Sequence, residues 1–313
     1  MVNRPYDREL VIAALRQALP YIRLYRGRVF VVKAGGAMCA DQAVLRDLAQ
    51  QLGVLCELGI RVVIVHGGGP QTTSISEKLG LQTTFVEGRR VTSPETLDVA
   101  VMTISGTVNT AILAACRSAQ VAGIGVSGVD AGLVKAVRRP PQQKTVNGET
   151  VTVDYGLVGD VVSVDPGVVN RLLDAGFVPV VSPLAADDHG QVLNINADTV
   201  ASSLARALGA EKLIFLTDTT GLLEDRKNPG SLVSYTDVAG LEALQARGVI
   251  DGGMLPKVKA AKEALVGGVK RVHMVGYQGA SSLLIEIFTN EGAGTLIVRD
   301  TADLAPAEHG GAS

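Results

Sequence analysis

One stretch, residues 61–70 (RVVIVHGGGP), limits the folds open to this chain more than any other. Its four consecutive branched apolar residues are typical of a strand buried on both faces, as in a parallel sheet covered by helices. Three glycines and a proline follow, and residues 72–79 can then form a helix. Glycines let a ligand approach the backbone, and amide groups ahead of a helix can converge on an anion. The stretch predicts a phosphate or carboxylate site, since a plain turn would need only one glycine.

The composition supports an α/β fold. The chain has 313 residues, of which 47% are hydrophobic and only 4% aromatic, with 36 glycines and no tryptophan. Such a core consists mainly of Val, Ile, Leu and Ala, as in proteins with a parallel sheet.

Charge and cysteine usage exclude several classes of function. The net charge is −2 without a dense basic run, so nothing favours nucleic acid or an acidic membrane surface. Cys39, Cys56 and Cys116 include no Cys-x-x-Cys pair and are interpreted as free thiols in a reducing compartment. We find no apolar run of membrane-spanning length and no signal-like N-terminus. A soluble cytoplasmic enzyme is expected.

A second glycine loop follows an earlier strand, at residues 30–37 (FVVKAGGA), before a predicted helix over 42–58. Lys33 lies where this strand ends. An unpaired lysine in an apolar strand would cost several kcal/mol, so we expect an anionic partner beside it; a lysine whose charge reaches water is the alternative. Ligands of parallel sheets bind outside the carboxyl ends of the strands, so both glycine loops should open on one crevice.

Polar groups cluster at other predicted strand and helix ends. Arg90 precedes a helix over 94–118 and can clamp a carboxylate. Asn194, Asn196 and Asp198 stand at alternate positions before a helix over 199–208, where one cap would suffice. We therefore expect a ligand contact and an organising residue among them.

The predicted strand 212–217 ends at Asp218 and a glycine loop. Lys257 lies near the N-terminus of a predicted helix over 257–267, where the helix dipole disfavours a cation unless an anion is bound beside it.

Two patterns are not interpreted as sites. Residues 123–128 (GIGVSG) match the dinucleotide fingerprint by letter, but a helix precedes them and a strand follows, which reverses the required order. Asp187, Asp188 and His189 beside a glycine are more typical of a turn than of a metal site. Residues 133–164 have antiparallel character and a turn signal at 147–148, which predicts a hairpin lid over the sheet edge.

Residues 9–26 predict a helix interrupted at Pro20, where the proline removes a backbone hydrogen bond and kinks or breaks the helix. Its apolar stripe needs the main body or another subunit to lie against. The tail over 300–313 is expected to be disordered.

These groups together suit phosphoryl transfer, in which catalysis is mainly positioning and neutralisation of negative charge. The chain has no Gly-Lys-Ser/Thr of a P-loop, no protein-kinase signature and no Gly-x-Ser-x-Gly elbow. A carboxylate acceptor would need no general base, which agrees with only four histidines.

Six motifs, in order over roughly residues 20–298, resemble those of the acetylglutamate kinases of the amino acid kinase superfamily. They are residues 31–36 (VVKAGG), 65–71 (VHGGGPQ), 88–92 (GRRVT), 194–198 (NINAD), 216–218 (LTD) and 252–257 (GGMLPK). The resemblance implies a three-layer αβα sandwich with a mostly parallel central sheet and a β-hairpin lid. It also implies ATP-dependent phosphorylation of the γ-carboxylate of N-acetyl-L-glutamate in arginine biosynthesis. Mg²⁺ would be carried by the ATP phosphates, with no metal site made by the protein.

The resemblance assigns roles to single residues. Lys33 and Lys257 would stabilise the transferring phosphoryl group, and Asp198 would hold the two lysines in place. The acyl amino acid would bind Gly68, Gly69, Arg90 and Asn194. The residues implied to bind ATP are Gly35, Gly36, Asp218, Thr219, Thr220, Gly221, Leu222, Leu223, Val249, Ile250 and Asp251.

The N-terminal helix with Tyr21 resembles an extension that joins dimers into hexamers in arginine-inhibited members. His273, Glu286 and Gly292 fall where those members bind L-arginine; alternatively, His273 caps a strand and Glu286 lies on a helix surface. The resemblance implies a homo-hexamer inhibited by arginine. It also implies four parts: residues 1–26 for oligomerisation and regulation, 27–190 for the substrate, 191–299 for the nucleotide, and the tail 300–313.

The chain departs from the family pattern at three positions. Ala34 and Ala37 replace a usual Tyr and Asn, and Val129 replaces a usual Lys. These changes leave open a related kinase for carrier-bound or N-acylated aminoadipate or glutamate. A catalytically silent regulatory relative is the other alternative, against which the intact lysines and aspartates argue.

Overall fold

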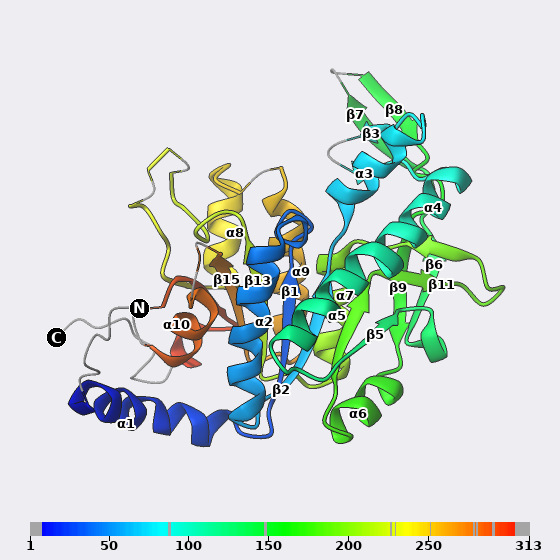
Figure 1. The fold of residues 1–313 in the computed structure, drawn as a ribbon. Coiled ribbons are helices and arrows are strands. Elements are labelled where there is room, and N and C mark those ends of the chain that lie inside the picture. The colour runs from blue at the N-terminus through cyan, green and yellow to red at the C-terminus, as the bar shows by residue number, and fades with distance from the viewer. Residues whose placement is uncertain are drawn as a thin grey trace.

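The computed structural model describes residues 8–86, 89–146, 149–225, 227–228, 230–250, 252–277, 279, 281–289 and 292–303. Its centre is an eight-stranded sheet in the order β14-β16-β15-β13-β1-β2-β10-β5 (Figure 1). The strands in that order are β14 (Tyr235–Asp237), β16 (Gly294–Val298), β15 (Arg271–Gly276), β13 (Lys212–Thr217), β1 (Val29–Ala34), β2 (Arg61–His66), β10 (Val178–Ser182) and β5 (Gly123–Ser127).

Neighbouring strands of this sheet are parallel, except for the antiparallel pair β15–β16. In the register, Ala34 at the end of β1 lies between His66 on β2 and Leu216 on β13. The three strands therefore end at one edge of the sheet, and the glycine loops after β1 and β2 emerge side by side. This confirms the mostly parallel sheet expected from sequence.

Helices cover both faces of the sheet and complete the three-layer sandwich. Alternate residues of each strand enter opposite cores: Val31 and Val63 face one core, whereas Phe30 and Ile64 face the other. This is why the strands are apolar at every position. The first core is closed by α6 (Gly167–Asp174), α7 (Ala197–Ala207), α8 (Val238–Ala246) and α9 (Met254–Val266), and the second by α2 (Gln42–Glu57), α5 (Asn109–Ser118) and α10 (Ser282–Phe288).

A second, four-stranded sheet has the order β12-β11-β6-β9. Its strands are β12 (Val192–Asn194), β11 (Leu184–Ala186), β6 (Val134–Arg138) and β9 (Gly159–Val164). The expected hairpin is formed by β7 (Gln142–Val146) and β8 (Glu149–Val153), paired antiparallel. It stands out from the body in Figure 1, beyond the short pair β3 (Phe85–Val86) and β4 (Arg89–Arg90). The turn signal at residues 147–148 lies outside the described residues.

The long helix over Pro94–Ser118 is not regular throughout. It consists of α4 (Pro94–Val101), a π-helical segment η2 (Met102–Val108) and α5. By length and composition this helix could cross a membrane, which contradicts the expectation that no run is long enough. Half of its apolar window is buried inside the protein, so the feature is weak evidence for a membrane span.

The N-terminal helix α1 (Arg8–Tyr25) passes through Pro20 as one element, so the proline does not break the helix, and the kink stays a prediction. Tyr25 packs edge-on against Phe30 with 5.2 Å between ring centroids, which anchors the end of α1 to the core. Several apolar side chains of α1 remain exposed: Ile12, Leu15, Leu19 and Leu24.

Smaller elements agree with the sequence. Residues 123–127 form a strand and not a loop ahead of a helix, as the rejection of the dinucleotide motif required. Asp187 accepts hydrogen bonds from the amides of His189 and Gln191, both 2.9 Å, which is the predicted turn. The remaining elements are α3 (Gly69–Lys78), η1 (Met38–Ala40), η3 (Asp130–Gly132) and η4 (Thr301–Asp303). In the tail expected to be disordered, residues 301–303 form η4, and residues 304–313 lie outside the described residues.

Candidate active site

The two predicted glycine loops are in direct contact. The amide of Gly67 donates to the carbonyl of Ala34 (3.0 Å), which joins the loop after β2 to the end of β1. A Cβ placed on Gly36 would lie 3.2 Å from the amide nitrogen of Gly68 and 3.3 Å from that of Gly69. The two amides therefore approach one point above Gly36, and a side chain there would fill the space that they share. This arrangement suits an anion.

Two lysines from opposite halves of the chain contact one carboxylate. Lys33 Nζ lies 2.7 Å from Asp198 Oδ1, and Lys257 Nζ donates to Asp198 Oδ2 at 3.3 Å. Lys33 comes from the end of β1, Asp198 from the first turn of α7 and Lys257 from the first turn of α9. The sequence predicted all three residues, and the structure brings them together.

The charges of this cluster are largely withdrawn from water. The side chains of Lys33 and Asp198 are 6% and 5% exposed, and that of Lys257 is 21% exposed. Burial alone would raise the pKa of Asp198, but the two ammonium groups outweigh it and lower the pKa below its usual value. Asp198 is thus a carboxylate at neutral pH. Its Oδ1 makes no directed hydrogen bond within the described part of the chain, so its attraction to Lys33 is chiefly Coulombic.

A cleft of about 490 Å³ opens beside the second glycine loop. Residues of both halves of the chain line it, among them Gly67, Gly68, Gly69, Arg90, Asn194, Asn196 and Gly253. The predicted substrate residues Gly68, Gly69, Arg90 and Asn194 are therefore gathered on one cavity.

Arg90 is fixed at the cleft by its neighbours. Its Nη2 donates to the carbonyl of Gly69 (2.9 Å) and to Thr73 Oγ1 (2.6 Å), and its guanidinium lies over the ring of Phe85. Its Nη1 is buried and has no hydrogen-bond partner among the described residues. A buried donor of this kind calls for an acceptor, and a ligand carboxylate would supply one.

The three polar residues around the start of α7, Asn194, Asn196 and Asp198, have separate tasks. Asn196 is the N-cap, since its Oδ1 accepts from the amide of Thr199 (3.0 Å). Asp198 holds the lysines. Asn194 lines the cleft and donates to Thr92 Oγ1 at 3.4 Å. Asp198 is thus the expected organiser beside a cap, whereas a ligand contact by Asn194 stays a prediction.

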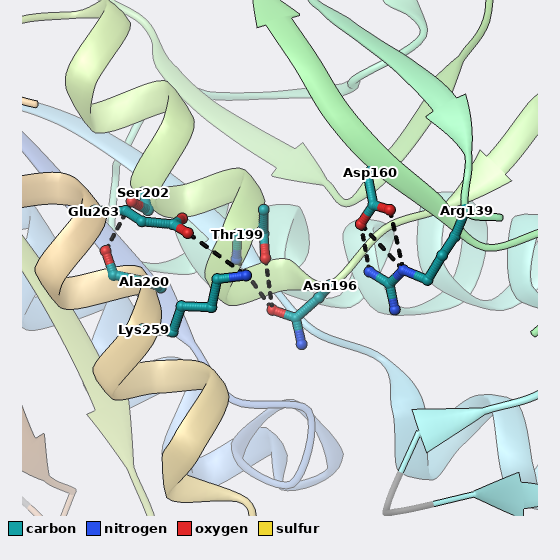
Figure 2. Close-up of polar contacts among 8 residues, drawn as sticks. All are labelled: Arg139, Asp160, Asn196, Thr199, Ser202, Lys259, Ala260 and Glu263. Atoms are coloured by element: carbon teal, nitrogen blue, oxygen red, sulfur yellow. Dashed lines mark hydrogen bonds and ion pairs between the residues drawn. The ribbon is translucent and has the colours of Figure 1, made fainter. Parts of the chain in front are cut away.

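Figure 2 shows two walls of the cleft. Asn196 and Lys259 stand on one side, and the other carries Arg139, whose guanidinium holds Asp160 in a bidentate pair with contacts of 2.6 to 3.2 Å. Sequence reasoning missed Arg139, Asp160 and Lys259. Only the folded chain brings Arg139, which follows β6, and Asp160 on β9 to the same cleft as Lys259 on α9, and no motif marks these residues.

None of the predicted ATP-binding residues that the structure describes lines this cleft, although Gly36 adjoins Gly68 and Gly69. Asp218 follows β13 and thus emerges at the sheet edge beside Gly35. Asp218 and Thr219 are exposed, whereas the side chains of Leu222 and Ile250 belong to the core, so only their backbone groups can face a ligand. Leu222 donates its amide to Thr295 Oγ1 (2.9 Å). Thr220, Leu223 and Val249 are half-buried, Gly221 is buried, and Asp251 lies outside the described residues.

The residues assigned to arginine also gather in one place. His273 Nδ1 lies 2.6 Å from Glu286 Oε1, and its Nε2 lies 2.9 Å from Lys212 Nζ. Glu286 Oε2 accepts from the amide of Ala293 (2.6 Å), close to Gly292. His273 and Glu286 are 3% and 7% exposed, so the alternative of a strand cap and a surface glutamate is wrong. Burial, reinforced by Lys212, lowers the pKa of His273 to about 4.

Tyr21 reaches the same region from α1. Its ring packs edge-on against Phe288 at the end of α10, with 6.4 Å between centroids, and stacks on Tyr25. The helix that carries Glu286 is therefore in contact with the N-terminal helix.

Sequence comparison places this geometry in a known family. The profile described as "Amino acid kinase family" matches residues 28–276. The chain is 47% identical over 292 residues to an acetylglutamate kinase of Myxococcus xanthus, covering 93% of this chain and 95% of the relative. It is 41% identical over 285 residues to that of Heliobacterium modesticaldum, covering 91% and 97%.

Solved structures of other proteins share this fold. N-acetylglutamate synthase from Neisseria gonorrhoeae, complexed with coenzyme A and N-acetyl-glutamate, matches with a TM-score of 0.79 and 28% identity over 93% of this chain, which spans 64% of the synthase. The synthase complexed with coenzyme A and L-arginine matches with a TM-score of 0.77 and 29% identity, over 92% of this chain and 65% of that one. Carbamate kinase from Giardia lamblia bound to AMP-PNP shares the fold, with a TM-score of 0.64 and 19% identity over 88% of this chain and 99% of that one. The chain is therefore an enzyme of the amino acid kinase family and belongs among its acetylglutamate kinases.

Proposed function

We propose that this enzyme transfers the γ-phosphoryl group of ATP to the γ-carboxylate of N-acetyl-L-glutamate, giving N-acetyl-L-glutamyl 5-phosphate for arginine biosynthesis. The observation that carries the proposal is the pair of ammonium groups on the buried carboxylate of Asp198, next to two glycine loops.

The chemistry needs positive charge more than it needs a base. The acceptor carboxylate is already an anionic nucleophile, and the migrating phosphoryl group spreads negative charge over its equatorial oxygens. Lys33 and Lys257 supply two positive charges against the single negative charge of Asp198, so the cluster is net positive before any ligand binds. Preorganised cations and amides of this kind stabilise charge that develops in the transition state.

Recognition of the acyl amino acid is assigned to the cleft. The unpaired Nη1 of Arg90 would bind a carboxylate, with Asn194 as a neutral hydrogen-bonding group beside it. Two of the three departures from the family pattern lie elsewhere: the Ala34 methyl is in the core, and Val129 lines a different cavity. This favours N-acetyl-L-glutamate over a longer or carrier-bound acceptor.

The nucleotide is assigned to the sheet edge at the ends of β1 and β13. Gly35 and Gly36 would approach its phosphates, whereas the exposed Asp218 and Thr219 have side chains free to meet it. Mg²⁺ would travel with the ATP phosphates and offset their charge. The division into a substrate lobe over 27–190 and a nucleotide lobe over 191–299 remains part of this proposal.

An acceptor panel tests the reaction. ADP release is measured with N-acetyl-L-glutamate, with N-acetyl-aminoadipate and without acceptor; we expect turnover chiefly with the first. Equal or greater turnover with N-acetyl-aminoadipate would instead favour a related kinase for aminoadipate. No turnover with either acceptor would support a catalytically silent regulatory relative.

Lys257→Ala tests the residue assignment. We expect kcat to fall about 10²-fold or more with little change in melting temperature, because an ammonium group facing the transferring phosphoryl is lost. Lys262→Ala is the matched control, since Lys262 lies on the same helix and pairs with Glu242 at the surface. A Lys257 variant that melts but retains specific activity when folded would make the residue structural.

We further propose a cytoplasmic homo-hexamer inhibited by L-arginine. The exposed apolar side chains of α1 would be covered by a second subunit, and Tyr21 links that helix to α10, which carries Glu286. The carboxylate of Glu286 could meet a guanidinium.

The arginine proposal predicts that millimolar L-arginine lowers the rate, and that Glu286→Gln weakens the inhibition with kcat retained. An unchanged wild-type rate would refute it. Deletion of residues 1–25 should reduce the mass in light scattering from hexamer to dimer.

A further inference from the structure

A buried histidine lies immediately before the glycine triplet, and neither of its hydrogen-bond partners is a residue predicted to bind a ligand. His66 ends β2 and is 0% exposed. Its Nδ1 lies 2.9 Å from the carbonyl oxygen of Gly67, and its Nε2 lies 3.1 Å from Asn109 Nδ2. A carbonyl oxygen can only accept, so the hydrogen is on Nδ1 and the ring is neutral with Nε2 as the acceptor.

Asn109 completes this arrangement. Its Nδ2 donates one hydrogen to His66 and the other to the carbonyl of Val180 (2.9 Å). A Cβ on Gly125 would lie 2.1 Å from Asn109 Oδ1, so the side chain fits only because β5 has a glycine at this point. One asparagine thereby spans the strands β2, β10 and β5.

The π-helical segment η2 places that asparagine. A π turn adds a residue to the helix and shifts the side chains that follow it, and such turns are frequent at functional sites. Asn109 comes directly after η2, and Ile104 within η2 packs on the second glycine of the triplet, since a Cβ on Gly68 would lie 2.9 Å from Ile104 Cγ1. The same helix therefore supports the glycine loop at two points.

The geometry of the Gly67–Gly68 peptide shows what this support does. The Gly67–Gly68 peptide is trans and planar, so its C=O and N–H groups point in opposite directions. His66 holds the Gly67 oxygen toward the interior, which turns the Gly68 N–H away from it, to the side of the cleft and of Gly36. The Gly68 amide donates no hydrogen bond within the described part of the chain.

We propose that His66, held by Asn109, is a positioning residue that fixes the Gly67–Gly68 peptide so that the Gly68 N–H binds the anion undergoing transfer. The inference rests on the proposed phosphoryl transfer and adds to it a preset amide donor. Because the histidine acts through the backbone and never exchanges a proton, it sets kcat and leaves the affinity for ATP unchanged.

Two substitutions of His66 separate positioning from packing. In His66→Asn the amide nitrogen can take the place of Nδ1 and donate to Gly67. In His66→Gln the amide reaches only the place of Nε2, and the donor to Gly67 is lost. Both side chains are neutral and polar. The exposed His189→Gln is the control for a histidine outside the network.

We expect His66→Gln to lower kcat about 10²-fold, the loss typical of one misdirected oxyanion donor, with the KM for ATP within about twofold. His66→Asn should recover most of that loss. Equal kcat values in the two variants, or a change confined to KM, would overturn the proposal.

The tautomer is measured separately by ¹⁵N NMR of the wild-type enzyme, with the His66 signal assigned by elimination in His189→Gln, His273→Gln and His309→Gln. We expect a neutral ring carrying its proton on Nδ1 from pH 5.5 to 8; a proton on Nε2 or a charged ring would refute the arrangement even if both His66 variants fail to fold. The NMR measurement of the His66 tautomer does not depend on turnover. An enzyme that fails to phosphorylate N-acetyl-L-glutamate while His66 shows the expected tautomer would thus disprove the proposed function and retain the network.

Discussion

At the scale of single residues, Asp198 decides the charge balance of the site. It is 4% exposed and pairs with Lys33 and Lys257, which come from strands and helices far apart in the sequence. A buried ion pair is weak evidence for stability, because desolvation offsets much of the attraction, but removing one partner leaves uncompensated charge. The carboxylate is needed because the site requires two cations close together.

Asp198→Asn should therefore reduce both stability and turnover. We expect a loss of about 3 kcal/mol in the free energy of unfolding, measured with urea at pH 7, because two confined ammonium groups would repel each other. The folded-state pKa of Asp198 lies below its unfolded value, so its stabilisation is present above about pH 4 and disappears as the pH falls through the folded pKa. The wild-type and variant curves should converge in acid.

Asp174→Asn is the control, since Asp174 pairs with Arg61 at the surface and is 70% exposed. We expect a change of about 0–1 kcal/mol there. Losses of equal size in the two variants would contradict the buried-cluster interpretation.

At the scale of elements, the helix over Pro94–Ser118 is more than a cover for the sheet. Its π-helical centre brings Ile104 onto the glycine loop and Asn109 into the polar network. Gly125 on β5 leaves room for the Asn109 side chain. The contact between β5 and this helix therefore depends on the glycine at position 125.

Gly125→Ala and Gly106→Ala compare a glycine that contacts Asn109 with a glycine that has open space beside it. The Cβ at position 125 would meet Asn109 Oδ1 at 2.1 Å, so we expect a loss of about 1–3 kcal/mol in the free energy of unfolding and a lower kcat. At Gly106, within η2, nothing lies within 4 Å, and alanine should leave activity intact and stabilise by up to about 1 kcal/mol. Urea unfolding and initial rates measure both. A harmless Gly125→Ala would contradict the close fit.

At the scale of the whole molecule, two buried histidines couple folding to pH. Burial lowers the pKa of His66 from 6.5 to about 4. Burial, with Lys212 and Arg271, lowers that of His273 to about 4 against the opposing effect of Glu286. Both rings are neutral in the folded protein but take up a proton in the unfolded chain below pH 6.5. Their stabilisation is therefore complete above pH 6.5 and is lost as the pH falls toward 4.

We expect each histidine to contribute a slope of about 1.4 kcal/mol per pH unit over this window. Urea unfolding between pH 4.5 and 7.5 measures it. His66→Asn and His273→Gln should each remove one slope, whereas His189→Gln should leave the profile unchanged. A flat wild-type profile below pH 6.5 would contradict the burial of neutral rings.

Local pattern determined a large part of this protein. Branched apolar runs followed by glycine fixed β1 and β2 as buried strands with ligand loops, and Lys33 and Lys257 stood out because each conflicts with its immediate surroundings. The Asn-Gly turn and the alternation after it gave the hairpin. Of the two effects predicted for Pro20, a break does not occur, because α1 continues through that residue as one helix.

Only the tertiary structure decided which groups share one site. A period of 3.6 could not reveal the π-helical turn, and no local signal pairs Asn109 with His66 or Arg139 with Asp160. The tertiary structure also decided that His273 and Glu286 form a buried pair. Secondary structure follows from interactions among near neighbours, which a sequence displays directly. The electrostatics of a buried site depend on which distant side chains exclude water from it, and that is fixed only when the sheet and its helices assemble.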